Sequence, residues 1–290
     1  AGTNYTSENL TLHLTTSDLD SDSIKNITNW YLNGTSITVL NMPFENVSGG
    51  IYNATNDYSG YGNNGTEAGG VTWNATGGYD GKGAYDFDGV DDYIEIKDSN
   101  FLDISSTITL SAWVKFNSFT GAWGRIVAKD DNDVQPEYGI IDGDSNYVRA
   151  VIFNTGGTEI AVDTPLLSTN TWYHIAFTYD TNNGLIIYNN GIAGNTTVAN
   201  GNIRTSTDNL LIGSAGDGDN LFNGTIDEVK IFNRSLSAEQ ILALYNNRTN
   251  LIVSNETSIG DNWSACITPN DGEGDGAESC SNNLTILNNV

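Results

Sequence analysis

Short runs of alternating hydrophobic and polar residues fill most of the chain, separated by turns rich in glycine and asparagine. The segments 107–116 and 172–179 follow the two-residue period of a half-buried strand. Helical spacing occurs at 237–245, with Ser235 or Ser237 as the expected N-cap. Many short strands at intervals of about 8–15 residues predict an all-β protein built from two packed sheets.

The stretch 83–96 (GAYDFDGVDDYIEI) is the most regular part of this pattern. Two alternating segments, 84–87 and 93–96, flank an acidic corner that contains a glycine. The pattern predicts a pair of strands joined by an acidic turn.

Strand patterns also occur at both ends of the chain. The N-terminal part has alternating runs at 27–32 and 35–40, joined by Asn33-Gly34, which is a strong hairpin signal. Each end alone is too short to close a sandwich, so we expect one sandwich made from both ends with a second domain inserted between them. The expected domains are 1–41, 42–246 and 247–290; two unrelated terminal tails are the alternative.

Five motifs in the middle of the chain occur in a familiar order: FDGVDDYI, TLSAWV, WYHIAFTYD, LIG and GTIDEVKIFNRSLS. This order resembles the laminin-G-like, concanavalin A-like superfamily, which implies a jelly roll with a structural calcium and a sugar- or protein-binding face. The terminal segments resemble immunoglobulin-like repeats of large prokaryotic surface proteins. The expected fold class is therefore all-β, a concanavalin A-like jelly roll inserted into an immunoglobulin-like sandwich.

The same resemblance implies a calcium site where the first and last strands of the jelly roll meet. Asp227 in the motif near the end of the domain is the first expected ligand, and Glu45, Asp88, Asp91 and Asp92 are acidic positions that would complete the shell. The residues themselves allow another interpretation, because aspartates at such a corner also form hydrogen-bonded turns. The segment 217–220 is a second candidate and has the same alternative.

The charge balance excludes several classes of partner. Eleven basic and thirty-six acidic residues give a net charge of -25, which repels nucleic acid and anionic lipid and favours cations. Simple solvation of the surface explains the same charge. An apolar run of about 18 residues is missing, so we expect no membrane insertion.

Glycosylation sequons and the two cysteines indicate an extracellular location. Fifteen Asn-x-Ser/Thr sites occur, about twice the roughly seven that this composition gives by chance. The asparagines of these sites are Asn4, Asn9, Asn26, Asn33, Asn46, Asn53, Asn64, Asn74, Asn195, Asn223, Asn233, Asn247, Asn255, Asn262 and Asn283. We expect Cys266 and Cys280 to form a disulfide that closes a loop of about 15 residues.

The sequence predicts no enzyme. Jelly-roll glucanases carry Glu-x-Asp-x-x-Glu on one strand, and neither Glu95 nor Asp227-Glu228 fits that spacing. His174 lies in a strand pattern without a nucleophile motif, so a structural role is expected.

Aromatic residues offer a possible binding surface. Trp73, Trp123, Tyr58 and Tyr61 fall in or near loops, where exposed rings stack on sugars or simply pack against their own domain.

Three functions agree with these features. The main hypothesis is an extracellular structural or adhesive glycoprotein unit of a cell surface, such as an S-layer, adhesin or filament subunit, with copies of itself as partners and an archaeal source favoured. The alternative is a carbohydrate-binding module, and a glycoside hydrolase is third.

Overall fold

The computed structural model describes residues 5–17, 22–46, 54–119, 121, 123–130, 135–198, 200–215 and 220–288. Most of the regular structure in these ranges is β-strand. The helical elements there are α1 (Ala238–Tyr245) and the single 3₁₀ turn Ser254–Glu256. Ser237 is the N-cap of α1, as predicted, because its hydroxyl accepts a hydrogen bond from the Gln240 amide.

Two antiparallel sheets pack face to face and form a jelly roll. The seven-stranded sheet has the order β13-β12-β11-β10-β17-β8-β5. Its strands are Glu159–Asp163 (β13), Val148–Phe153 (β12), Tyr138–Asp142 (β11), Arg125–Lys129 (β10), Leu210–Ile212 (β17), Tyr93–Ile96 (β8) and Gly65–Ala68 (β5).

The eight-stranded sheet has the order β16-β15-β14-β9-β18-β7-β6, and β4 pairs with β18 beside β7. Its strands are Ile192–Thr197 (β16), Gly184–Asn189 (β15), Trp172–Asp180 (β14), Thr107–Phe116 (β9), Asn223–Phe232 (β18), Ala84–Asp88 (β7), Thr72–Asn74 (β6) and Thr38–Met42 (β4). The facing sides of the two sheets hold the main core, including Phe87, Phe116 and Phe177. The predicted all-β sandwich is confirmed.

The acidic corner at Asp88–Asp92 connects a strand of one sheet to a strand of the other sheet. It does not connect two strands that pair with each other. β7 pairs with β6 and β18, whereas β8 pairs with β5 and β17. The predicted pair of strands is therefore wrong in one respect: the strands exist, but they lie in opposite layers of the sandwich. Alternation alone cannot distinguish these arrangements, because both place every second side chain in the same core.

The two ends of the chain form a third layer. β1 (Leu10–Thr11) pairs with β19 (Leu251–Ile252), and β2 (Lys25–Leu32) pairs with β20 (Asn262–Asn270) along eight residue pairs. β2 and β20 belong to a five-stranded sheet that also contains β3 (Thr35–Ser36), β21 (Ser279–Cys280) and β22 (Leu284–Thr285), whereas β1 and β19 form a separate two-stranded sheet. The expected association of the two ends is thus present, while their assignment to an immunoglobulin-like domain stays a prediction.

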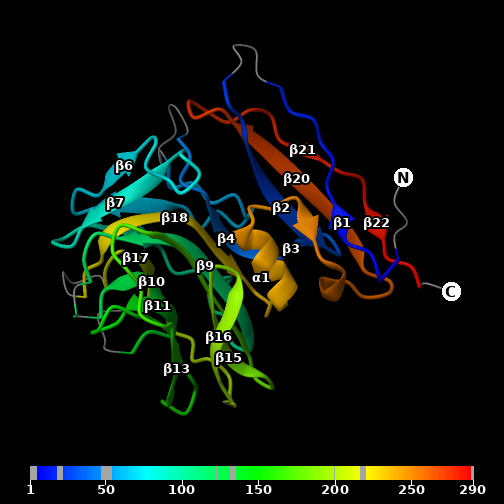
Figure 1. Cartoon of the computed structure of the whole chain (residues 1–290). Coiled ribbons are helices and arrows are strands. Elements are labelled where there is room, and N and C mark those ends of the chain that lie inside the picture. The colour runs from blue at the N-terminus through cyan, green and yellow to red at the C-terminus, as the bar shows by residue number, and fades with distance from the viewer. Residues whose placement is uncertain are drawn as a thin grey trace.

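The terminal sheet packs on the outer face of the eight-stranded sheet, with α1 between the two (Figure 1). Trp30 and Trp263 of the terminal sheet share a hydrophobic cluster with Ala176, Tyr188 and Phe232 of the jelly roll. The terminal layer begins and ends outside the jelly roll, but β4, at residues 38–42, already belongs to the eight-stranded sheet. The expected boundary between residues 41 and 42 therefore falls inside a strand.

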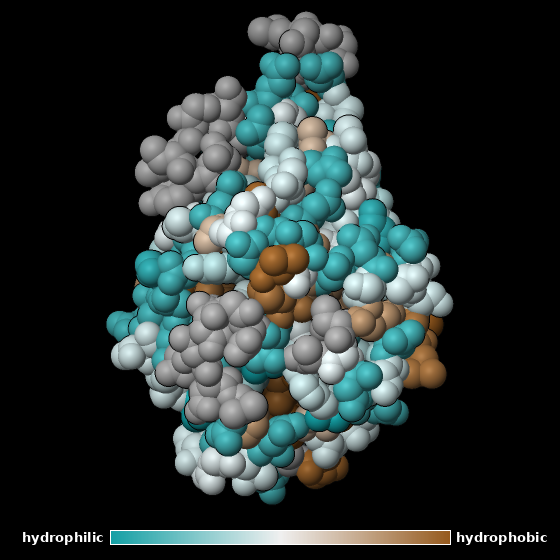
Figure 2. Space-filling view, turned by 90° about the vertical axis from the view of Figure 1, so that its left-hand side faces the viewer, coloured by the Kyte–Doolittle hydropathy of each residue, from teal (hydrophilic) through white to brown (hydrophobic). Residues whose placement is uncertain are grey.

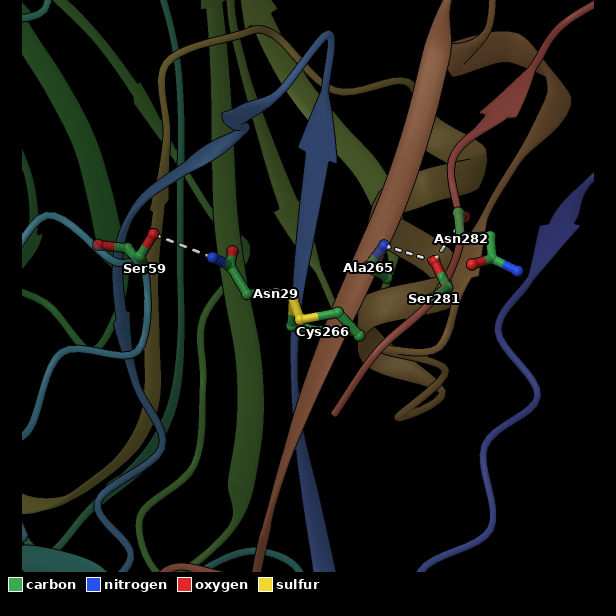
Figure 3. Close-up of a disulfide and its surroundings, with 7 residues drawn as sticks. Asn29, Ser59, Ala265, Cys266, Ser281 and Asn282 are labelled. Atoms are coloured by element: carbon green, nitrogen blue, oxygen red, sulfur yellow. Dashed lines mark hydrogen bonds between the residues drawn. A yellow bond between two sulfur atoms is a disulfide. The ribbon is translucent and has the colours of Figure 1, made fainter. Parts of the chain in front are cut away.

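Cys266 and Cys280 form the predicted disulfide, which joins β20 to β21 (Figure 3). The Ser281 hydroxyl beside it accepts a hydrogen bond of 3.0 Å from the Ala265 amide. On the other side of β20, Asn29 donates a hydrogen bond of 2.9 Å to the Ser59 carbonyl. The disulfide thus fastens the C-terminal strands to the terminal sheet.

Candidate functional site

A groove of about 210 Å³ lies on the outer face of the seven-stranded sheet. Its floor comes from residues that alternate with core residues on β11 and β12, so they point away from the main core. Three of these floor residues, Ile141, Val151 and Phe153, are apolar and cluster together. An apolar floor on the outward side of a sheet departs from the polar pattern expected there and marks a candidate binding surface.

Trp123 and Arg149 form one wall of this groove. The Arg149 guanidinium carbon lies 4.8 Å from the centre of the Trp123 ring, within range of a cation–π interaction. Asp163 on the neighbouring strand holds the guanidinium with two hydrogen bonds of 2.7 and 3.1 Å. The Trp123 backbone has a φ of 59°, a left-handed conformation that is uncommon for tryptophan. Arg149, itself held by Asp163, therefore restrains the indole through the cation–π contact.

The rim of the groove is formed by polar and charged side chains. Glu159 is the only carboxylate among the described residues that line it, and one of its oxygens lies 3.4 Å from Arg149. Glycoside hydrolysis ordinarily uses a pair of carboxylates that flank the bond to be broken. The arrangement instead offers a flat ring, an apolar floor and hydrogen-bonding groups at the edge, which suit binding of an amphipathic ligand such as a sugar.

Two of the predicted metal ligands, Glu45 and Asp227, lie in one buried cluster at the junction with the terminal layer. At the centre of this cluster is the ammonium of Lys25 from β2. Its nitrogen lies 2.7 Å from Glu45, 2.9 Å from Asp80 and 2.6 Å from Glu228. A lysine side chain thus supplies the positive charge for which the sequence predicted a calcium ion.

The cluster forms where β18 changes partner. β7 pairs with β18 up to Ile226 and β4 pairs with it from Val229 onward, which leaves Asp227 and Glu228 at an irregularity in the strand. Glu228 has a φ of 52°, so the backbone turns sharply here. This bulge lets two consecutive carboxylates point into the junction.

Burial and charge together set the ionisation of this cluster. Burial alone would raise the pKa of Glu228, but the ammonium groups of Lys230 and Lys25 lower it to about 2. Burial opposes the charge of Lys25, yet Glu228 and the other carboxylates raise its pKa well above the ordinary value. Asp227 differs, because its complete burial raises its pKa far above the usual range.

The other predicted ligands lie elsewhere, and residues 217–219 of the second candidate segment fall outside the described residues. Asp88 pairs with Asn223, four residues before Asp227 on β18, so these two aspartates are separated by about 13 Å along the strand. The five acidic residues therefore do not form the single shell that the sequence suggested. Glu45 and Asp227 belong to the Lys25 cluster, whereas the three remaining aspartates lie at the corner. The two groups are apart because they lie at opposite ends of the stretch over which β7 pairs with β18.

At the corner, Asp88, Asp91 and Asp92 each bring one carboxylate oxygen within 4.8 Å of the others. Asp92 accepts a hydrogen bond of 2.9 Å from the Asp88 amide, and Asp88 accepts one of 2.7 Å from Val90. Burial raises the pKa of Asp92, and the charges of Asp88 and Asp91 raise it further. This set of crowded oxygen donors fits a hard cation such as calcium, and it also forms the turn that was the alternative.

His174 is buried against Trp113 and Tyr245. Burial, with a smaller contribution from the charge of Lys230, lowers its pKa to about 3. The imidazole is therefore neutral at physiological pH and lies in packed surroundings, in keeping with the structural role expected for it.

Three of the four aromatic residues singled out in the sequence serve the fold. The Trp73 indole donates to the Phe44 carbonyl, and the Tyr58 hydroxyl lies 2.8 and 2.9 Å from the two carboxylate oxygens of Asp275. Tyr61 packs on Phe101. Trp123 alone of the four lines the groove.

Thirteen of the fifteen sequon asparagines lie at least partly on accessible surface. Asn4 and Asn53 fall outside the described residues, and none of the other thirteen asparagines is buried. Hydrophilic residues dominate the face shown in Figure 2, and apolar residues form only small separate patches there. The predicted glycosylation is compatible with this surface and stays a prediction.

Two central residues carry no clear signal in the sequence. Lys25 and Arg149 each occupy a polar position in an alternating strand, where a charged residue ordinarily faces solvent. The scarcity of basic residues, eleven in 290, is the one feature of the sequence that favours a specific partner for each of them.

Comparison with known proteins identifies the family. The Laminin_G_3 model, described as the concanavalin A-like lectin/glucanases superfamily, matches residues 88–242, and the chain belongs to this family. A search of curated proteins found no match.

Solved structures with similar folds include toxin binding domains. The binding domain of Paraclostridial Mosquitocidal Protein 1 has a TM-score of 0.57 at 19% identity and covers 73% of this chain and 52% of that one. The Botulinum neurotoxin serotype G binding domain has a TM-score of 0.56 at 20% identity, with 73% and 51% covered. The serotype D binding domain has a TM-score of 0.58 at 16% identity, again with 73% and 51% covered. The chain thus spans about half the length of these proteins, and the likeness concerns the fold.

In the described part of the chain, no helix has the length and apolar character needed to cross a membrane.

Proposed function

We propose that this chain is an extracellular, non-catalytic adhesive unit whose jelly roll binds glycans in the Trp123 groove. The observation that carries the proposal is the placement of an indole, an apolar floor and a charged rim on the outward face of one sheet. Membership of a lectin and glucanase superfamily and a fold shared with binding domains support a binding role. The accessible sequons support secretion and a cell-surface location.

A glycan array provides the test. Wild-type protein is expected to bind a restricted set of glycans, and Trp123→Ala to weaken that binding at least about tenfold. Ile192→Ala is the matched control, because Ile192 is 71% exposed on β16 of the other sheet. Equal binding by wild type and Trp123→Ala would exclude the groove, and release of reducing sugar would contradict the non-catalytic role.

A structural role in an array of identical copies is the second candidate. It is favoured by the third layer, in which both ends of the chain form one sheet outside the jelly roll (Figure 1). Electron microscopy of purified protein distinguishes the two, because an array-forming unit yields ordered assemblies without added glycan. Dispersed monomers would count against this candidate.

Calcium at Asp88, Asp91 and Asp92 is part of the proposal. The cation would neutralise three carboxylates that lie close together and hold the corner between the two sheets. Its expected contribution is to stability.

A further inference from the structure

The strand orders of the two jelly-roll sheets end at four strands, and these edges differ in charge. The seven-stranded sheet ends at β13 and β5, which carry Glu159, Asp163 and Glu67. The eight-stranded sheet ends at β16 and β6, and neither of these strands contains a charged residue. Charged side chains commonly protect an edge, because an unpaired edge can otherwise pair with another chain. The eight-stranded sheet therefore lacks this protection at both ends of its strand order.

β16 is the longer of the two uncharged edges. It has six residues against three in β6, and it belongs to a stretch, 181–203, that contains no charged residue. Five of its six residues are exposed, including Ile192 at 71%, and Val198 directly after the strand is 83% exposed. Exposed, uncharged and β-branched residues on an edge strand favour pairing with a second chain. The acidic charge by which two copies repel each other is absent from this strand.

Both uncharged edge strands contain the asparagine of a sequon, Asn74 in β6 and Asn195 in β16. Gly194 and Asn195 together lie opposite Ile187, because the register between β16 and β15 shifts by one residue there. Such a bulge leaves a residue out of the regular ladder. Asn195 is exposed, and its amide nitrogen donates one hydrogen to the Asp163 carbonyl at 2.8 Å. Attachment of a sugar replaces the other hydrogen of this nitrogen and leaves the bond to Asp163 in place.

We propose that Asn195 carries an N-glycan, and that this glycan keeps the β16 edge from pairing with a second copy of the chain. A pairing strand would lie about 4.8 Å from β16, and a bulky, hydrated glycan in the middle of that edge occupies the same space. Asp163 belongs to β13, so the Asn195 side chain lies on the side of the sandwich where β13 and β16 come together (Figure 1). The glycan thus replaces the charges that protect β13 and β5. The inference rests on the extracellular location proposed for the chain, because N-glycans belong to secreted proteins.

Sedimentation velocity of protein secreted from an N-glycosylating host tests the assignment, with peptide mass analysis to show that Asn195 is glycosylated. Thr197→Ala removes the sequon but keeps Asn195, and it is expected to self-associate at least about tenfold more tightly than wild type. Thr197→Ser is the matched control, because it keeps an Asn-x-Ser sequon and is expected to sediment like wild type. Ser235→Ala removes the sequon of Asn233, which follows the central strand β18, and is also expected to sediment like wild type.

Two further variants test the edge itself. Asn195→Gln removes the same sequon at its other position and is expected to associate as Thr197→Ala does. Thr196→Lys, added to Thr197→Ala, places a charge on the exposed edge without a glycan and is expected to restore wild-type sedimentation. Thermal unfolding of each variant shows that it is folded before it is sedimented.

Each contrary result overturns the proposal. An unglycosylated Asn195 in wild type, unchanged association in Thr197→Ala, the same increase in Ser235→Ala, or no reversal by Thr196→Lys would do so. Trp123→Ala is expected to sediment like wild type, and Thr197→Ala, below the concentration at which it associates, is expected to keep wild-type binding on the glycan array. Failure of the Trp123 groove and failure of the Asn195 glycan are therefore distinguishable.

Discussion

Lys25 belongs to the terminal layer, whereas the three carboxylates around its ammonium belong to the jelly roll or to the segments that lead into it. A single side chain therefore carries much of the electrostatic connection between the two layers. Because the partners are buried, removal of the lysine leaves charges that water cannot reach easily, and the cost is far larger than for a surface ion pair.

Lys25→Met is expected to lower the free energy of unfolding by about 3–5 kcal/mol. Lys97→Met, which removes an exposed ion pair with Glu95, is expected to change it by less than about 1 kcal/mol. Urea denaturation at neutral pH measures both. Similar values for the two variants would mean that the buried cluster contributes no more than a surface pair.

Glu137 gives the molecule a pH dependence at a second buried site. Its side chain is buried 3.7 Å from the Lys129 ammonium, and burial raises its pKa to about 7 from an ordinary 4.5. The folded state thus holds a proton that the unfolded state releases between these values, so the contribution of this group to stability falls as pH rises from 4.5 to 7. Below 4.5 the contribution is fully present.

Glu137→Gln, which keeps the shape and stays neutral, is expected to remove this loss. The free energy of unfolding of the variant minus that of wild type is expected to increase by roughly 1–3 kcal/mol from acidic to mildly alkaline pH. Denaturation curves at both pH values measure the difference. A constant difference between the two proteins would show that Glu137 ionises normally in the folded state.

At the scale of elements, the corner between β7 and β8 is the point where the chain passes from one sheet to the other. Three carboxylates crowd there, and their mutual repulsion opposes the fold unless a cation or a proton reduces it. The stability of the contact between the two layers of the jelly roll is therefore expected to depend on ionic conditions.

Calcium is expected to raise the melting temperature of the metal-free wild type. The double variant Asp88→Asn/Asp91→Asn is expected to lose this response, and to melt at or above the temperature of metal-free wild type because the repulsion is relieved. The control is Glu239→Gln, on the exposed first turn of α1. A calcium response that survives in the double variant would place the ion elsewhere.

Short elements could be predicted because the residues that specify them are neighbours in the sequence. The strand at Thr107–Phe116, the helix capped by Ser237 and the hairpin at Asn33-Gly34 all agree with the sequence. In the hairpin, Asn33 and Gly34 have φ values of 53° and 81°, which this residue pair adopts readily.

The candidate sites could be predicted only in part, because they depend on contacts between distant residues. The Lys25 cluster joins residues 25, 45, 80 and 228, and no spacing in the sequence indicates that they meet. Trp123 was identified as a loop aromatic, but its partner Arg149 was not. Sheet membership of the strands on either side of the corner is also a long-range property. It depends on pairing with strands that are distant in the sequence.

The whole molecule is a stack of three layers in which the middle one, the eight-stranded sheet, is covered on both faces. This arrangement separates the Trp123 groove on one side from the terminal sheet on the other. Changes confined to the terminal sheet should therefore leave the groove intact.

Replacement of both cysteines by serine tests this separation. The variant Cys266→Ser/Cys280→Ser is expected to lose about 3 kcal/mol of stability in the chain-entropy model, and to bind glycans with wild-type affinity. Thermal unfolding and the glycan array provide the two measurements. A parallel loss of stability and binding would show that the layers are coupled.

The adjacency of the two ends has a mechanical consequence. Tyr5 and Leu287 form a β-bridge, and behind it β2 and β20 are joined along eight residue pairs. A tensile load applied between residues 5 and 287 acts first on that bridge and then on the β1–β19 and β2–β20 pairings. The jelly roll, which lies in the chain between these two strands, stays out of the load path until these pairings part, and so the Trp123 groove keeps its shape while the molecule is pulled.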